Sequence, residues 1–164
     1  MNKKHSQIKK TSCVIYARAA SQDLSKNANS LLEQVKRLEG YAQVNHLKIK
    51  ESFLEIGSGA VINPKLKEML AYMEANGIEN ILTNDINRIA RNDAIFTEIC
   101  NLAYVKQITT PSYTFHLDNK GDALMLTILR GIESTMHSVR SIQAKQAYIR
   151  AKNNTLEKNT HGKH

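Results

Sequence analysis

The feature of this sequence that most constrains its fold is a run of apolar residues, Cys13 to Ala17, that ends directly on Arg18. A short apolar run bounded by polar residues is typical of a buried β-strand. In open α/β sheets the carboxyl ends of the strands face the ligand crevice. We therefore expect a strand over residues 12–18 that carries a permanent cation, Arg18, to the functional edge of a sheet.

After this strand the sequence alternates between helical and extended patterns, which is typical of an α/β protein with a mostly parallel sheet. Helices are predicted over residues 30–44, 64–76, 93–105 and 122–152, and further strands over 47–56, 78–83, 108–110 and 113–117. We expect a mostly parallel central sheet of four to five strands, flanked by helices and followed by a long C-terminal dimerisation helix. The alternation over 47–56 is only partly clean, which predicts a strand near an edge.

Residues with capping preferences mark the starts of two helices. Ser30 and Glu33 have the spacing of a capping box, and Asn63 followed by Pro64 is typical of an N-cap and a first helical position. The polar segment 19–29 then connects the first strand to the first helix. Because it follows the carboxyl end of a strand, this segment is a candidate active-site loop.

The chain has 164 residues, enough for one domain with its own core, and a formal net charge of +8 at pH 7. This charge favours a polyanionic partner, nucleic acid first and an anionic membrane second, although scattered surface lysines would give the same balance. Cys13 and Cys100 lie far apart and lack metal-ligand spacing, so we expect reduced cysteines in a cytoplasmic protein. We expect no signal peptide and no membrane span.

The last part of the chain is dominated by the helix predicted over residues 122–152. One stripe of it stays apolar beyond the length that a small domain needs, and cations occupy other positions. These candidate DNA-binding residues are Arg130, Arg140, Lys145, Arg150 and Lys152. We expect dimerisation through the stripe and polyanion contact through the cations; the alternative is a solvated helix packed on its own domain. The chain then divides into an α/β domain over 1–121, this helix, and a flexible tail over 153–164.

Polar residues that suit an anion follow each of the first three predicted strands. They are Arg18 after the first, Ser58 after the second, and Arg88 and Arg91, on one side of a helical turn, after the third. In parallel neighbouring strands they meet at one edge, where guanidinium groups suit a phosphodiester because arginine offers bidentate hydrogen bonds and keeps its charge. The alternative is that the arginines are surface residues paired with acidic side chains, namely Asp85, Asp93 or Glu55.

Four parts of the chain, in this order, resemble motifs of the serine recombinases, the resolvase/invertase family that also includes large phage integrases and transposon recombinases. Residues 16–21 are similar to the family's Y-x-R-V-S-[ST], and residues 30–34 to its S-L-x-x-Q helix start. Residues 55–59 with 64–66 resemble D-x-x-S-G followed by R-P-x-L, and residues 87–91 resemble D-R-L-[SG]-R. The resemblance identifies the chain as similar to the N-terminal catalytic domain of that family.

The resemblance implies a chemistry and a set of partners. In this family a serine hydroxyl attacks a DNA phosphodiester to form a 5′-phosphoserine link, paired dimers exchange strands, and the reverse attack reseals them without metal or cofactor. It implies that a phosphate site is lined by Arg18, Ser58, Arg88 and Arg91. It further implies DNA as the partner, a homodimer or a tetramer on DNA, and neither a membrane nor a small-molecule substrate.

The sequence departs from the family pattern at the residue that performs the chemistry. Ala20 occupies the nucleophile position, and a methyl group cannot attack phosphorus. Ser21 is the candidate substitute, but neighbouring side chains of an extended chain point to opposite sides, so its use requires a local twist. Other departures are Asn63 for the arginine of R-P-x-L, Asn87 for the aspartate before the arginine pair, and Met136 and His137 for a Glu-Arg pair.

These observations leave alternative functions. The first is a serine recombinase catalytic domain that binds DNA but is inactive because of Ala20, whether that alanine is natural or a substitution. The second is an assembly or regulatory subunit that forms mixed dimers with an active recombinase. The third is an unrelated α/β domain that binds phosphate or nucleotide, since such folds are widely reused. We expect no DNA-reading helix-turn-helix domain and therefore little sequence-specific recognition.

Overall fold

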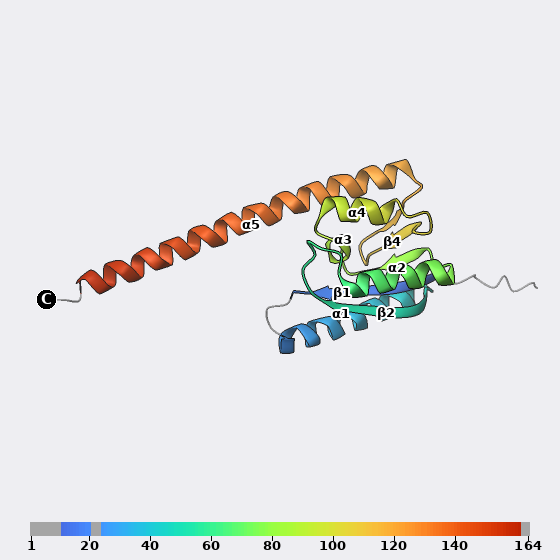
Figure 1. Ribbon diagram of the computed structural model, residues 1–164, viewed down its shortest axis with the longest axis horizontal. Coiled ribbons are helices and arrows are strands. Elements are labelled where there is room, and N and C mark those ends of the chain that lie inside the picture. Colours follow the sequence, from blue (N-terminus) through green and yellow to red (C-terminus); the bar gives the residue numbers. More distant parts are fainter. Residues whose placement is uncertain (1–10, 21–23, 162–164) are drawn as a thin grey trace, which may run out of the picture. The chain divides into compact units, whose positions relative to one another are not determined.

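The computed structural model describes residues 11–20 and 24–161 (Figure 1). The strands are β1 (Ser12–Ala19), β2 (Lys48–Ile56), β3 (Asn80–Leu82), β4 (Gln107–Thr109) and β5 (Thr114–His116). The helices are α1 (Leu24–Val44), α2 (Pro64–Asn76), α3 (Ile86–Ile89), α4 (Asp93–Cys100) and α5 (Lys120–His161). The chain divides into two units at Met125, so α5 begins in the first unit and continues as the second.

The five strands form one sheet in the order β2-β1-β3-β4-β5. β1 pairs in parallel with β2 and β3, β3 pairs in parallel with β4, and β5 is antiparallel to β4. The predicted α/β class with a mostly parallel sheet of four to five strands is therefore confirmed. β2 lies at an edge, as its partly clean alternation predicted.

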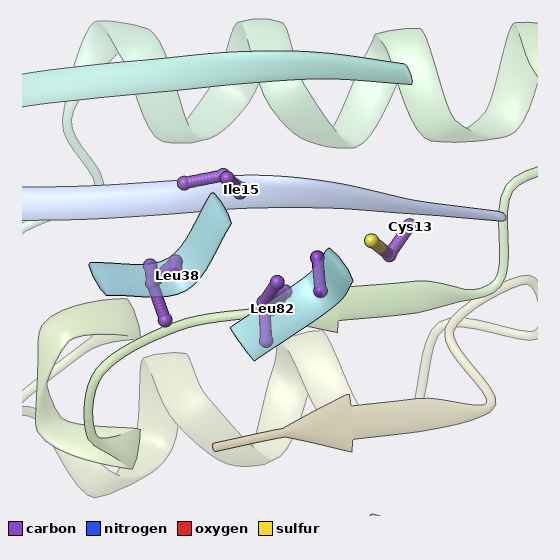
Figure 2. Close-up of a cluster of buried hydrophobic side chains, with 5 residues drawn as sticks. Cys13, Ile15, Leu38 and Leu82 are labelled. Carbon is purple, nitrogen blue, oxygen red and sulfur yellow. The ribbon is translucent and has the colours of Figure 1, made fainter. Parts of the chain in front are cut away.

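Both faces of β1 are covered, which explains why its sequence is a continuous apolar run. Cys13 and Ile15 pack with Leu38 of α1 and Leu82 of β3, and Figure 2 shows these side chains gathered on one face of the sheet. Because successive side chains of a strand alternate in direction, Arg18 belongs to the opposite face. The burial of every β1 residue from Cys13 to Ala19 follows from this central position.

Helix α1 begins earlier than predicted. Its first residue is Leu24, so part of the expected loop is helical, and the predicted N-cap at Ser30 is wrong. Ser30 lies inside the helix, where its Oγ accepts a hydrogen bond from Gln34 Nε2 at 3.3 Å. Residues 28–30 are exposed. Because these residues bury no side chains, they add no apolar stripe from which the start of the helix could be predicted.

Helix α2 begins with Pro64 as predicted, but its cap is different. Asn63 occupies the N-cap position without a capping hydrogen bond from its side chain. Instead, Glu55 Oε2, at the end of β2, accepts a hydrogen bond from the Lys65 backbone N–H at 2.7 Å. A carboxylate at this place also opposes the positive end of the helix dipole.

The helix predicted over 93–105 ends earlier, at Cys100, and a separate turn of helix, α3, precedes it. Two side-chain caps divide the segment: Asp85 accepts from the Asn87 N–H, and Asn92 accepts from the Ala94 N–H, each at 2.9 Å. Helix α5 covers more than the predicted 122–152, because it continues through residues 153–161 that were expected to form a tail.

Candidate functional site

The strand order brings the ends of β1, β2 and β3 together at one edge of the sheet. The chain passes from β1 to β2 on one side of β1 and then to β3 on its other side, so the order reverses beside β1. Ligands of open α/β sheets bind at such a reversal, outside the carboxyl ends of the strands. The predicted anion-binding residues lie at this edge.

Arg18 is fully buried, which the sequence did not predict for a ligand-binding cation. Its Nε donates to Arg88 O at 3.0 Å, its Nη1 to Gly57 O at 3.0 Å and its Nη2 to Asn87 O at 2.9 Å. Burial lowers the pKa of Arg18, and the positive charges of Arg91 and Arg88 lower it further. Arginine nevertheless keeps its proton in proteins, so a charged group is held here by backbone carbonyls.

Arg88 is joined to Arg18 in both directions. Arg88 Nη1 donates to Arg18 O at 3.1 Å, while Arg18 Nε donates to Arg88 O. Arg88 Nε also donates to Asp85 Oδ2 at 3.1 Å, and the Arg88 side chain remains 34% exposed. One of the acid pairings that the sequence left open is therefore present, and part of the Arg88 side chain still reaches solvent.

Gly59 lies in the loop after β2, and its backbone packs closely against the side chains of Arg18 and Arg91. A Cβ at Gly59 would lie 2.5 Å from Arg18 Nη2 and 2.9 Å from Arg91 Cγ. Gly59 O accepts hydrogen bonds from the backbone N–H groups of Arg91 at 2.7 Å and Asn92 at 3.3 Å. Arg91 itself is exposed, so it is the most accessible of the three predicted arginines.

Two of the three remaining predicted positions of the site lie at the surface. Ala20 is exposed immediately after β1, and Ser58 is exposed in the loop after β2. Ser58 Oγ accepts a hydrogen bond from the Ala60 N–H at 3.1 Å. Ser21, the candidate substitute nucleophile, lies outside the described residues. The structure thus brings the three arginines together at the edge that carries Ala20.

A buried polar layer lies under the loop that carries Ser58. Asn63 is 7% exposed, and its Nδ2 donates to Ser58 O at 2.6 Å. Glu55 is 8% exposed and caps α2 as described above. Burial and the Glu55 charge together raise the pKa of Tyr16 to about 12, so its phenol is neutral at ordinary pH. Asn63, where the family motif has arginine, therefore supports the loop through an amide.

Sequence reasoning missed three supports of this edge: Gly59, the amide of Asn63 and the cap formed by Glu55. Only Gly59 carried a signal, because the Ser-Gly pair belonged to the recognised motif. The others depend on contacts between segments that sequence spacing does not reveal.

The cations predicted on α5 differ in exposure. Arg130 is 8% exposed, whereas Arg140, Lys145 and Arg150 are exposed. The Lys152 backbone is helical, and its side chain is outside the described set. Met136 and His137 stand where the family has a Glu-Arg pair. Met136 is exposed. The side chain of His137, like that of Lys152, is outside the described set.

Two kinds of feature are absent from the described part of the chain. No three His, Cys, Asp or Glu side chains there come close enough together to hold a metal ion. None of the helices described combines the length and apolar character that crossing a bilayer requires.

Cys13 is buried, and burial raises the pKa of its thiol to about 11.

The chain is an α/β protein in which three arginines gather at the carboxyl ends of neighbouring strands. The family model described as "Resolvase, N terminal domain" matches residues 13–155, and the chain therefore belongs to the resolvase family. This confirms the resemblance to the serine recombinases that the sequence motifs predicted. No curated protein matches the chain.

Solved structures of an integrase domain and of two recombinases share this fold. The N-terminal catalytic domain of TP901-1 integrase is 19% identical, with a TM-score of 0.54, covering 78% of this chain and 98% of that one. A resolvase family site-specific recombinase from Streptococcus pneumoniae is 20% identical, with a TM-score of 0.54, covering 88% and 99%. The C-terminal catalytic domain of ISC1926 TnpA, an IS607-like serine recombinase, is 18% identical, with a TM-score of 0.50, covering 74% and 97%. At these identities the likeness concerns the fold.

Proposed function

We propose that this chain binds the phosphodiester backbone of DNA at its cation cluster and, with Ala20 in place of the nucleophile, does not cleave it. The observation that carries the proposal is the meeting of Arg18, Arg88 and Arg91 at the edge of the sheet where Ala20 follows β1. Fixed cations in such a place suit a phosphate, because they are already oriented when the anion arrives.

The missing step is the formation of the first covalent bond. A serine at position 20 would lose its hydroxyl proton as its Oγ forms an O–P bond, while the P–O3′ bond of the DNA breaks and the 3′ oxygen takes up a proton. Ala20 has only a methyl group and cannot form that bond. The arginines can hold and stabilise a negatively charged phosphate, but they supply no nucleophile.

The exposed face of α5 supports self-association. Large apolar side chains lie exposed along it, namely Leu124, Met125, Ile128, Ile132, Met136, Val139, Ile142 and Ile149. Exposed apolar surface of this extent marks an interaction site. We propose a homodimer through α5, or a tetramer on DNA, with the exposed Arg140, Lys145 and Arg150 contacting phosphates. A cytoplasmic location agrees with the two free cysteines, Cys13 and Cys100.

DNA binding is tested by its salt dependence on a random-sequence duplex. Each neutralised phosphate contributes about 0.9 to the slope of log K against log salt concentration. Arg91→Gln should lower the slope by about this amount. Lys106→Gln is the matched control and should leave the slope unchanged. Lys106 is an exposed cation immediately before β4, at the amino ends of the parallel strands and away from the arginines. Equal slopes for wild type and Arg91→Gln would refute phosphate binding at this edge.

Cleavage is tested by trapping with detergent after incubation with supercoiled DNA that carries a candidate site. The wild-type chain should form no covalent protein–DNA adduct. If Ala20→Ser then forms one, the remaining residues are competent and Ala20 alone blocks the reaction. An adduct with the wild-type chain would overturn the proposal, and its loss in Ser21→Ala would assign the nucleophile to Ser21.

The second candidate function is an assembly or regulatory subunit, which the exposed apolar face of α5 also favours. In that case the chain should associate tightly with a nucleophile-bearing relative, inhibit it, and bind little DNA alone. Native mass spectrometry of the mixture, with recombination by the relative as readout, separates the two functions. Strong DNA binding without mixed dimers would exclude the second.

A further inference from the structure

Arg18 stands first among the expected phosphate ligands, yet its surroundings differ from those of Arg88 and Arg91. We infer that Arg18 is a positioning residue: it fixes the two other arginines and does not itself contact the phosphate. The inference rests on the proposed function, since it specifies which cations of that site meet the DNA.

Three of the N–H donors of Arg18 are already used within the protein. Arginine has five N–H donors on three nitrogens, and in Arg18 each nitrogen donates to a backbone carbonyl. The acceptors are Arg88 O, Gly57 O and Asn87 O, at 2.9–3.0 Å. Turning the guanidinium toward an external anion would leave these carbonyls without their charged donor, which is unfavourable for buried groups.

Access to Arg18 is also closed. The side chain has no exposed surface, and the Gly59 backbone lies so close to Nη2 that even a methyl group there would sit 2.5 Å away. In contrast, Arg91 is exposed and the Arg88 side chain is 34% exposed. A phosphate in solvent therefore meets Arg88 and Arg91 without any rearrangement of the fold.

The same hydrogen bonds explain how Arg18 acts on its neighbours. Two bonds hold the backbone of α3 at Asn87 and Arg88, and Arg88 Nη1 returns a bond to Arg18 O. The third holds the loop at Gly57, and two residues later Gly59 O accepts from the Arg91 N–H at 2.7 Å. Arg18 thus holds both α3, which carries Arg88, and the loop whose Gly59 O accepts from the Arg91 N–H.

The test uses the Nε–Hε signals of arginine in 15N NMR spectra of the wild-type chain, assigned with single Arg→Lys variants. In the free protein the Arg18 signal should be protected from exchange with water. When a short DNA duplex is added, the signals of Arg91 and Arg88 should shift, and that of Arg18 should stay protected and move least. An Arg18 signal that exchanges rapidly, or that shifts as much as Arg91, would overturn the inference.

The Arg18→Lys variant tests positioning separately. It keeps the positive charge but cannot donate to three carbonyls in different directions, so the Arg88 and Arg91 signals should move in the free protein. DNA affinity should fall while the salt slope stays unchanged, whereas Arg91→Gln lowers the slope by about 0.9. Unchanged Arg88 and Arg91 signals would refute positioning.

The experiments distinguish failure of the inference from failure of the proposed function. If DNA moves none of the three arginine signals, the proposed function fails, while the free-protein signals still decide whether Arg18 positions its neighbours. If Arg18→Lys does not fold, Gly59→Ala displaces the same guanidinium, and the Arg88 signal then gives the free-protein readout, because a Cβ at Gly59 also contacts Arg91 directly. In that case the Arg18 signal of the wild-type chain is assigned by elimination, from Arg→Lys variants of the other arginines.

Discussion

Gly59→Ala is the substitution for which the structure gives the sharpest expectation. The new Cβ would lie 2.5 Å from Arg18 Nη2, 2.9 Å from Arg18 Cζ and 2.9 Å from Arg91 Cγ. The end of a long side chain usually moves aside easily, but Arg18 is buried and held by three carbonyls. The loop cannot easily retreat either, because Gly59 O accepts two backbone hydrogen bonds.

The magnitude follows from two opposing effects. Overpacking of a filled site costs about 1–3 kcal/mol. Replacing glycine removes freedom from the unfolded chain and returns about 0.4–1 kcal/mol. We therefore expect Gly59→Ala to lower the free energy of unfolding by about 1–2 kcal/mol, with weaker DNA binding because Arg88 and Arg91 are displaced.

Urea denaturation measures this change, and Gly40→Ala is its control. Gly40 lies in α1 with no atom within 4 Å of an added Cβ, so alanine should stabilise the helix by about 0.8–1 kcal/mol. The two glycine variants should thus shift the urea midpoint in opposite directions. A Gly59→Ala protein as stable as wild type, with unchanged DNA affinity, would refute the close packing of Arg18 against this loop.

Three further outcomes follow from the structure. Tyr16 has a folded-state pKa of about 12 against 10.0 for the free phenol. Its contribution to the free energy of unfolding is therefore present below pH 10 and is lost as the pH rises toward 12. Tyr16→Phe should make the free energy of unfolding fall less steeply over this pH range. Glu55→Gln should lower the free energy of unfolding by about 1 kcal/mol, because the α2 N-terminus loses a buried negative charge. Glu55 binds the backbone N–H of Lys65, so a larger loss in Lys65→Ala would argue against this cap. Ile132→Asp should shift the protein toward monomer in analytical ultracentrifugation, and an unchanged oligomer would argue against association through α5.

The elements of the α/β domain were largely predictable because each leaves a local mark. The apolar run ending at Arg18 predicted β1, and Pro64 predicted the start of α2. The start of α1 was not predictable, because residues 28–30 are polar and exposed, and a helical turn without an apolar face resembles a loop in sequence. Ser30 looked like a cap because a capping motif does not show whether the residues before it are already helical.

The candidate site was predictable in part for a similar reason. In a parallel sheet a cation placed after a strand reaches the carboxyl edge, so the meeting of Arg18, Arg88 and Arg91 was predictable on the condition that their strands are parallel neighbours. The state of each cation did not follow. Only the fold decides that Arg18 points into backbone carbonyls while Arg91 faces solvent.

The sequence by itself determined the residue types at the edge, including Ala20 directly after β1, and the order along the chain of the elements that carry them. These are properties of positions along the chain, which pattern and motif can reveal. The tertiary structure alone decided which charges are accessible, because burial and hydrogen bonding depend on segments such as the loop at Gly57 and helix α3, which lie far from Arg18 in the sequence. The same guanidinium group is a ligand for anions in one setting and a support for the backbone in another, and its surroundings make the difference.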